Sequence, residues 1–127
     1  MVTLILISHG GLAQSMLDTV ELLMGHQEDC YALGLDPGEP ACALATRCRP
    51  LLRRSGAVVL TDLLLGSPTN VVFPLLAEGS QLVTGMNLGM VVEALWARKA
   101  SDDPREIAIS LVRQGRAQIT LGGVPTL

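Results

Sequence analysis

The sequence predicts an α/β protein with a doubly wound, mostly parallel sheet and helices on both faces, in the flavodoxin-like strand order. Short apolar runs, such as Val2–Ser8 and Ala57–Thr61, alternate along the chain with patterns of helical spacing. The composition, 49% hydrophobic and only 17% charged, suits strands that are buried on both faces. Because no repeat or linker interrupts this order, we expect residues 1–127 to form a single domain.

The first half of the chain predicts two strands and two helices. They are a strand at Val2–Ser8, a helix at Leu12–Met24, a strand at Cys30–Leu35 and a helix that starts at Pro40. Pro50 lies inside the second helical pattern, where it removes a backbone hydrogen bond and clashes with the preceding turn. We therefore expect a kink or a break near Arg49.

The second half predicts three more helices and the remaining strands. Strands are expected at Ala57–Thr61, Gln81–Thr84 and Gln118–Leu121, and helices at 67–78, Leu88–Lys99 and 104–115. Ser67 is expected to cap the first of these helices, with Pro68 at its first position. The final short strand has to cover an edge of its own sheet or pair with another chain, since unpaired edges invite association.

Composition argues against several classes of function. The net charge is −3 and only three residues are aromatic, so neither a basic face nor a base-stacking platform for nucleic acid is expected. The three cysteines lack the spacing of a disulfide framework or a zinc site, and no metal is expected. The first apolar run is too short for a signal peptide or a membrane span, which predicts a cytoplasmic protein.

Two loops carry the candidate catalytic residues. His9 directly follows the first strand and Asp62 directly follows the third, and each loop precedes a helical pattern. In the strand order 2-1-3-4 these loops are neighbours at the carboxyl ends of the strands, where ligands bind in open α/β sheets. The predicted topology therefore places His9 beside Asp62.

The same loops offer donors for an anion. Backbone amides around Gly11–Ala13 and those after Ser67 lie at helix N-termini, which favour negative charge. A histidine there either holds a phosphate as a cation or accepts a phosphoryl group as a neutral nucleophile. In the second case the carboxylate of Asp62 would fix the ring tautomer. The expected phosphate-binding residues are Gly10, Gly11, Gly66 and Ser67.

Other interpretations of these residues are structural. His9 can be a hydrogen-bonded residue at a strand end, Asp62 a turn residue, and Ser67 a simple helix start. A different class of function is a non-catalytic module that binds an anion or a nucleotide. No GxGxxG or P-loop glycine pattern supports that class. The co-location of the histidine and the aspartate favours the catalytic interpretation.

Three segments together resemble a known family. Residues 7–13 (Ile-Ser-His-Gly-Gly-Leu-Ala), 60–70 (Leu-Thr-Asp-Leu-Leu-Leu-Gly-Ser-Pro-Thr-Asn) and 83–95 (Val-Thr-Gly-Met-Asn-Leu-Gly-Met-Val-Val-Glu-Ala-Leu) resemble the mannose-type (mannose/fructose/sorbose) IIA domain of the bacterial phosphoenolpyruvate-dependent sugar phosphotransferase system (PTS). The resemblance covers nearly the whole chain.

The resemblance implies a cytoplasmic phosphocarrier without a cofactor. His9 would take a phosphoryl group from phosphorylated HPr and pass it to a IIB domain, for coupled sugar uptake at a membrane transporter that this chain meets only indirectly. Asp62 matches the aspartate that orients the ring, and Ser67 a serine that contacts the phosphate. The family is dimeric, with an exchanged C-terminal edge strand that Gln118–Leu121 would supply. Two alternatives stay open, a regulatory phosphohistidine protein and a carrier subunit for dihydroxyacetone phosphorylation.

Two positions depart from the family pattern. Leu65 stands where the family usually has a glycine, so we expect it to restrict the loop backbone or to narrow access for a partner. Gly89 replaces a common proline, and we expect it to loosen the start of its helix. The chain also lacks the linker and fused IIB domain of some relatives, which predicts a free-standing protein.

Overall fold

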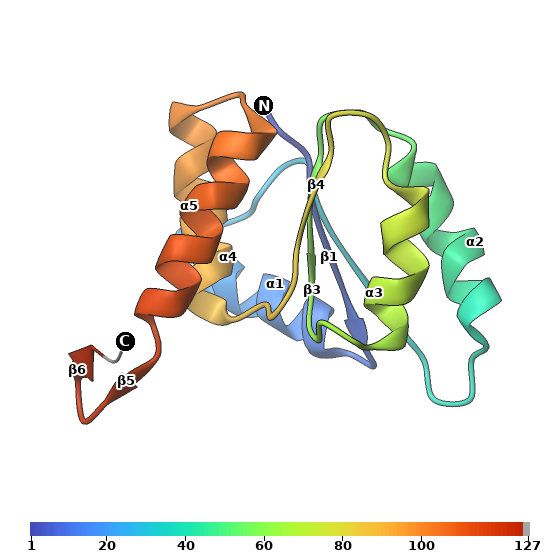
Figure 1. Ribbon diagram of the computed structural model, residues 1–127, viewed down its shortest axis with the longest axis horizontal. Helices are drawn as coiled ribbons and strands as arrows, with labels where there is room; N and C mark the ends of the chain where they lie inside the picture. The colour runs from blue at the N-terminus through green and yellow to red at the C-terminus, as the bar shows by residue number, and fades with distance from the viewer. Residues whose placement is uncertain (126–127) are drawn as a thin grey trace.

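A four-stranded parallel sheet forms the centre of the protein. The computed structural model describes residues 1–125 (Figure 1). The strands are β1 (Leu4–His9), β2 (Cys30–Leu35), β3 (Val58–Thr61) and β4 (Gln81–Val83), in the order β2-β1-β3-β4. All neighbouring strands run parallel. The predicted fold class and strand order are therefore confirmed.

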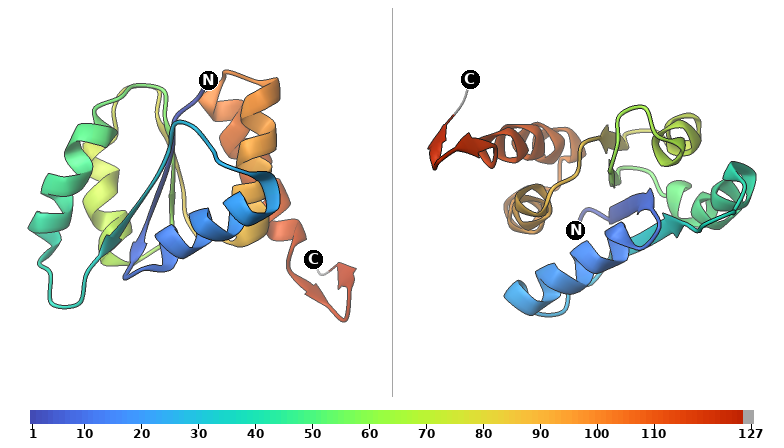
Figure 2. Two further views of the ribbon diagram at one scale, coloured as in Figure 1. Left: turned by 180° about the vertical axis from the view of Figure 1, so that it is seen from behind. Right: turned by 90° about the horizontal axis from the view of Figure 1, so that it is seen from below.

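Helices cover both faces of this sheet. They are α1 (Leu12–Met24), α2 (Ala41–Leu52), α3 (Ser67–Val72), the 3₁₀ turn η1 (Phe73–Leu75), α4 (Leu88–Ala100) and α5 (Pro104–Ala117). Figures 1 and 2 show α1, α4 and α5 on one face and α2 and α3 on the other. This is the doubly wound arrangement that the alternation of strands and helices predicts. Within residues 1–125, no helix combines the length and apolar character needed to cross a membrane.

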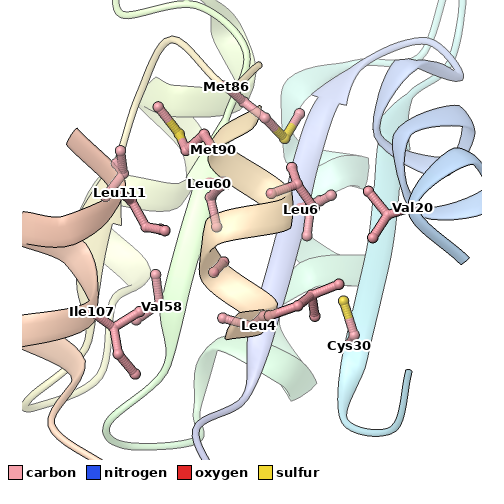
Figure 3. Close-up of a cluster of buried hydrophobic side chains, with 14 of the residues drawn as sticks. Leu4, Leu6, Val20, Cys30, Val58, Leu60, Met86, Met90, Ile107 and Leu111 are labelled. Carbon is pink, nitrogen blue, oxygen red and sulfur yellow. The ribbon is translucent and has the colours of Figure 1, made fainter. Parts of the chain in front are cut away.

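The central strand β1 divides its side chains between two cores. Leu4 and Leu6 belong to the core under α1, α4 and α5 (Figure 3), whereas Ile5 and Ile7 pack in the core under α2 and α3. All four are fully buried, which explains the uninterrupted apolar run in the sequence. The alternation continues to the end of the strand, so Ser8, which is also buried, and His9 point to opposite faces of the sheet.

Helix α2 continues through the proline that we expected to interrupt it. Of the kink or break expected near Arg49, the break is wrong, because the helix runs to Leu52, and the kink stays a prediction. Pro50 lies in the last turn, and the N–H of Arg53 still closes that turn on the carbonyl of Arg49 at 3.1 Å. A proline this close to a helix end removes one bond without splitting the helix.

Helix α3 is shorter than predicted and is capped differently. Gly66 occupies the cap position, so Ser67 is the first helical residue and its side chain makes no capping bond. The helix ends at Val72 and tightens into η1, which contains Pro74. Proline has no N–H to continue the α-helical ladder, so the helix expected up to residue 78 stops early.

The predicted C-terminal strand forms, but within a hairpin of its own. β5 (Thr120–Leu121) pairs antiparallel with β6 (Val124–Pro125) and adds no strand to the main sheet. Figures 1 and 2 show this hairpin extending from the end of α5, away from the sheet. In the described part of the chain, β4 therefore forms one edge of the sheet.

The buried guanidinium of Arg98 connects α4 to the segments that precede β1 and β2. Arg98 is only 5% exposed, and its guanidinium donates to the carbonyl oxygens of Val2 (3.3 Å), Glu28 (2.6 Å) and Asp29 (3.1 Å). These acceptors precede β1 and β2, at the end of the sheet opposite the carboxyl ends of the strands. Arg98 is therefore the donor for the carbonyls of Val2 and Glu28, and it adds a second hydrogen bond to the carbonyl of Asp29, which also accepts the amide of Leu4.

We expect Arg98→Ala to lower the free energy of unfolding by about 2–4 kcal/mol, because it removes a buried side chain and leaves the carbonyls of Val2 and Glu28 without their donor. Urea denaturation followed by circular dichroism measures this. Arg53→Ala is the matched control, since Arg53 is exposed at the end of α2. Similar losses in the two variants would contradict the role assigned to Arg98.

Candidate functional site

His9 and Asp62 meet at the carboxyl ends of β1 and β3. The two strands are paired up to Ile7 and Thr61, so the residues that follow emerge side by side. Nδ1 of His9 lies 2.8 Å from Oδ2 of Asp62. The proximity predicted from the strand order is therefore confirmed.

Asp62 is held in its ionised form by several donors. Oδ2 also accepts the backbone N–H of His9 at 2.9 Å, and Oδ1 accepts that of Leu63 at 3.0 Å. The side chain is only 9% exposed, and this burial acts to raise the pKa of the carboxyl group. The hydrogen bonds and charge of His9 outweigh it, so the pKa of Asp62 lies below its usual value. The result is a carboxylate that acts as an acceptor toward the ring.

This contact decides which ring nitrogen of His9 is available. An ionised carboxylate accepts only, so Nδ1 carries the proton that it shares with Asp62. In the neutral ring Nε2 then keeps its electron pair. Among residues 1–125, no hydrogen-bond partner occupies Nε2, and the side chain of His9 is 44% exposed. His9 thus presents an oriented imidazole ring on a partly exposed side chain.

Gly66 leaves the space in which the imidazole ring lies. A Cβ atom at this position would be 2.6 Å from Cε1 of His9 and 3.4 Å from Nε2. The amide of Gly66 donates to the carbonyl of Leu63 at 3.3 Å. Gly66 therefore shapes the site by its lack of a side chain, and its N–H is already engaged.

Gly34, which sequence reasoning missed, allows the loop after β1 to fold back against β2. Gly10 has a positive φ of 51°, and its amide donates to the carbonyl of Leu35 at 2.8 Å. A Cβ atom on Gly34, in the neighbouring strand, would overlap the carbonyl oxygen of Gly10. A glycine inside a strand pattern is the signal that would have revealed this close approach.

The remaining donors differ in whether they are free. Ser8 is buried on the α1 side of β1, and its Oγ accepts the amide of Ala13 at 2.8 Å. Within residues 1–125, the amides of Gly11 and Leu12 have no protein acceptor, and neither the amide nor the hydroxyl of Ser67 makes a hydrogen bond. Of the expected phosphate-binding residues, Gly11 and Ser67 thus keep free donors.

The two departures from the family pattern have local explanations. Leu65 does not adopt a positive φ, and its side chain is 87% exposed. Its expected effect on the loop backbone or on access for a partner stays a prediction. Helix α4 begins at Leu88, where the side chain of Asn87 caps it by accepting the amide of Met90 at 2.9 Å, and the loosening expected from Gly89 stays a prediction. Gly89 leaves room for Gln118, whose side chain a Cβ atom there would overlap.

Comparisons with known proteins agree with this geometry. The family described as "PTS system fructose IIA component" matches residues 3–110. The chain belongs to this PTS IIA family. The "PTS system mannose-specific EIIAB component" of Escherichia coli K12 is 32% identical over 123 residues, covering 91% of this chain and 38% of the relative. The chain therefore spans well under half the length of the curated relatives that it matches.

Solved structures support the same family and fold. The mannose/sorbose-specific IIA subunit from Enterococcus faecalis is 26% identical, with a TM-score of 0.82 and coverage of 99% of this chain and 98% of that one. A PTS IIA protein associated with the fucose utilization operon of Streptococcus pneumoniae is also 26% identical, with a TM-score of 0.80 and coverage of 96% of each chain. An EIIA component from Streptococcus agalactiae, 24% identical, covers 96% of this chain and 98% of its own, and its TM-score of 0.90 confirms the fold.

We expect Gly66→Ala to displace the ring of His9 and break its contact with Asp62, because the added methyl group overlaps Cε1. The fold should lose only about 1 kcal/mol, since His9 is partly exposed and is able to rotate away. Proton–nitrogen NMR of the imidazole measures the tautomer directly. Gly11→Ala is the control, because nothing lies within 4 Å of a Cβ atom there. An unchanged Nδ1–H signature in Gly66→Ala would contradict the assignment.

Proposed function

We propose that the protein is a cytoplasmic phosphocarrier in which His9 accepts a phosphoryl group from phosphorylated HPr and passes it to a IIB domain. The observation that carries the proposal is the 2.8 Å contact between Nδ1 of His9 and Asp62, which in the neutral ring leaves the electron pair on Nε2, in a side chain that is 44% exposed. Membership of the PTS IIA family supports the same reaction class.

In the proposed transfer, the electron pair of Nε2 attacks phosphorus, and the bond from phosphorus to the nitrogen of the donor's histidine breaks. The donor ring leaves with that electron pair. The proton on Nδ1 stays in its hydrogen bond to Asp62, whose charge stabilises the positive charge that develops on the imidazole. Oxygens of the transferred group would be met by the amides of Gly11 and Leu12 and by Ser67. Gly10 and Gly66 would act by shaping the loops.

The choice of sugar is proposed to lie in another component of the system. The similar proteins carry names that mention mannose, mannose/sorbose and a fucose operon. The site described here holds a histidine, a carboxylate and donors for a phosphoryl group, and this chemistry is the same for each sugar. We therefore propose phosphoryl relay, without contact to the sugar, as the contribution of this chain.

We expect phosphorylated HPr to add one acid-labile, base-stable phosphate to the wild-type chain, and Asp62→Asn to slow this transfer about 100-fold. The amide still occupies the carboxylate's place, but it no longer stabilises the ring tautomer and its developing charge. Rapid-quench labelling gives the rates. His9→Ala should take no label, and Asp18→Asn, an exposed carboxylate on α1, should behave as wild type. Equal labelling of His9→Ala would remove His9 from the mechanism.

We also propose that two chains form a dimer by exchanging the C-terminal hairpin. Leu121 and Val124 are 78% and 65% exposed on a hairpin that extends away from its own sheet. Strand β4 is an edge strand, and beside it a groove of about 690 Å³ is lined by apolar side chains of β4 and α5 and by Arg105, Arg113 and Arg116. A second copy's hairpin would pair with this edge and cover the groove, which supports a symmetric, closed assembly.

Light scattering should therefore give twice the monomer mass for the full chain at micromolar concentration. We expect Leu121→Lys to shift the protein toward the monomer, because its charge would be buried beside the arginines of the groove. Leu22→Lys is the control for adding a charge at an exposed leucine, since Leu22 is 87% exposed on α1. A wild-type monomer, or dissociation by both variants alike, would refute hairpin exchange while leaving the chemistry of His9 intact.

A further inference from the structure

A rigid turn of leucines stands directly beside His9. The amide of Gly66 donates to the carbonyl of Leu63, which closes a turn with Leu64 and Leu65 at its corners. The base of the turn is fixed on both sides. The amide of Leu63 donates to Oδ1 of Asp62, and the carbonyl of Leu63 accepts the hydroxyl of Thr69 at 2.5 Å.

The corner side chains of this turn project into solvent. Leu64 is 66% exposed and Leu65 is 87% exposed, although the turn is anchored to the buried site. Neither residue has a positive φ, so the backbone of the turn is unstrained at both leucines. Two adjacent, exposed leucines on a fixed turn contribute little to the fold, and such apolar surface is typical of a contact with another protein.

The surroundings of the turn offer little charge for recognition. In the loops 9–12 and 62–70, His9 and Asp62 are the only ionisable residues, and Asp62 is turned toward His9. In the next loop along the sheet edge, Glu39 is paired with Arg47 at 2.6 Å, and Asp36 is exposed. A partner that docks over His9 therefore meets few charged side chains in the loops beside the turn.

Transfer between two proteins also forces contact with this turn. The reacting nitrogens must approach the phosphorus to within about 3–3.5 Å. Gly66, the residue after Leu65, lies against the ring of His9. A protein that brings a phosphohistidine to Nε2 of His9 thus has to cover the adjacent corner of the turn.

We infer that Leu64 and Leu65 dock into an apolar recess on the protein that donates the phosphoryl group to His9. The inference rests on the proposed function and adds the recognition element. Leu65 is a recognition residue that touches the donor protein, whereas the reacting atoms belong to His9 and the transferred group.

The test compares a protein donor with a small one. Initial rates of transfer from phosphorylated HPr give KM and kcat, and phosphoramidate, which loses ammonia when Nε2 attacks its phosphorus, reports the intrinsic reactivity of His9. We expect Leu65→Ser to raise KM for phosphorylated HPr about tenfold, the scale of a leucine withdrawn from an apolar contact. The kcat should stay within about twofold of wild type, and labelling by phosphoramidate should not change.

Matched variants separate docking from other effects. Leu65→Met should restore the wild-type KM because it keeps the apolar contact, and Leu22→Ser, equally exposed but remote on α1, should leave it unchanged. The rise in KM should be the same at about 0.05 M and about 0.5 M salt, since the contact involves no charge.

Three results would overturn the inference. They are an unchanged KM in Leu65→Ser, a parallel loss of labelling by phosphoramidate, and a rise in KM that high salt abolishes. If the wild-type chain takes the phosphoryl group from phosphoramidate but not from phosphorylated HPr, the proposed carrier function fails, and the docking role fails with it.

Discussion

The hydrogen bond between His9 and Asp62 is the interaction on which the rest of the site depends. It joins the ends of two strands that are distant in sequence, and it acts on the backbone as well as on the ring, because Oδ2 accepts both His9 donors. The position of the ring then requires a glycine at residue 66, and the fold of the first loop requires one at residue 34. Each glycine is explained by the position of the loop and ring that carry the chemistry.

Because side chains alternate between the two faces along β1, its last two residues have different roles. Ser8 turns toward α1 and satisfies the amide of Ala13, whereas His9 turns toward α3 and lies against Gly66. A shift of β1 by one residue would exchange its two faces, and His9 would then turn toward α1. The register of β1 therefore determines which of the two side chains lies against Gly66.

Sequence reasoning reached the topology and the central pair because both follow from periodicity and strand order. It failed where a single backbone group decided the outcome. The amides of Gly10 and Gly66 were expected to be free for an anion, yet both donate to nearby carbonyls. Helix α3 stops at Val72 because of Pro74, and α2 survives Pro50 because only its last turn is affected. These outcomes depend on distances of a few ångströms that no residue pattern encodes.

Because the pKa of Asp62 is lower in the folded chain, the stability of the fold around the site depends on pH. An aspartate in the unfolded chain titrates near pH 3.9, and in the folded chain its pKa is lower. Between these two values the chain releases a proton as it folds. The stabilisation from the ionised carboxylate is fully present above the unfolded value and disappears as the pH falls through the folded one. Mild acid that protonates an ordinary carboxyl group thus leaves this one charged, and the ring of His9 oriented.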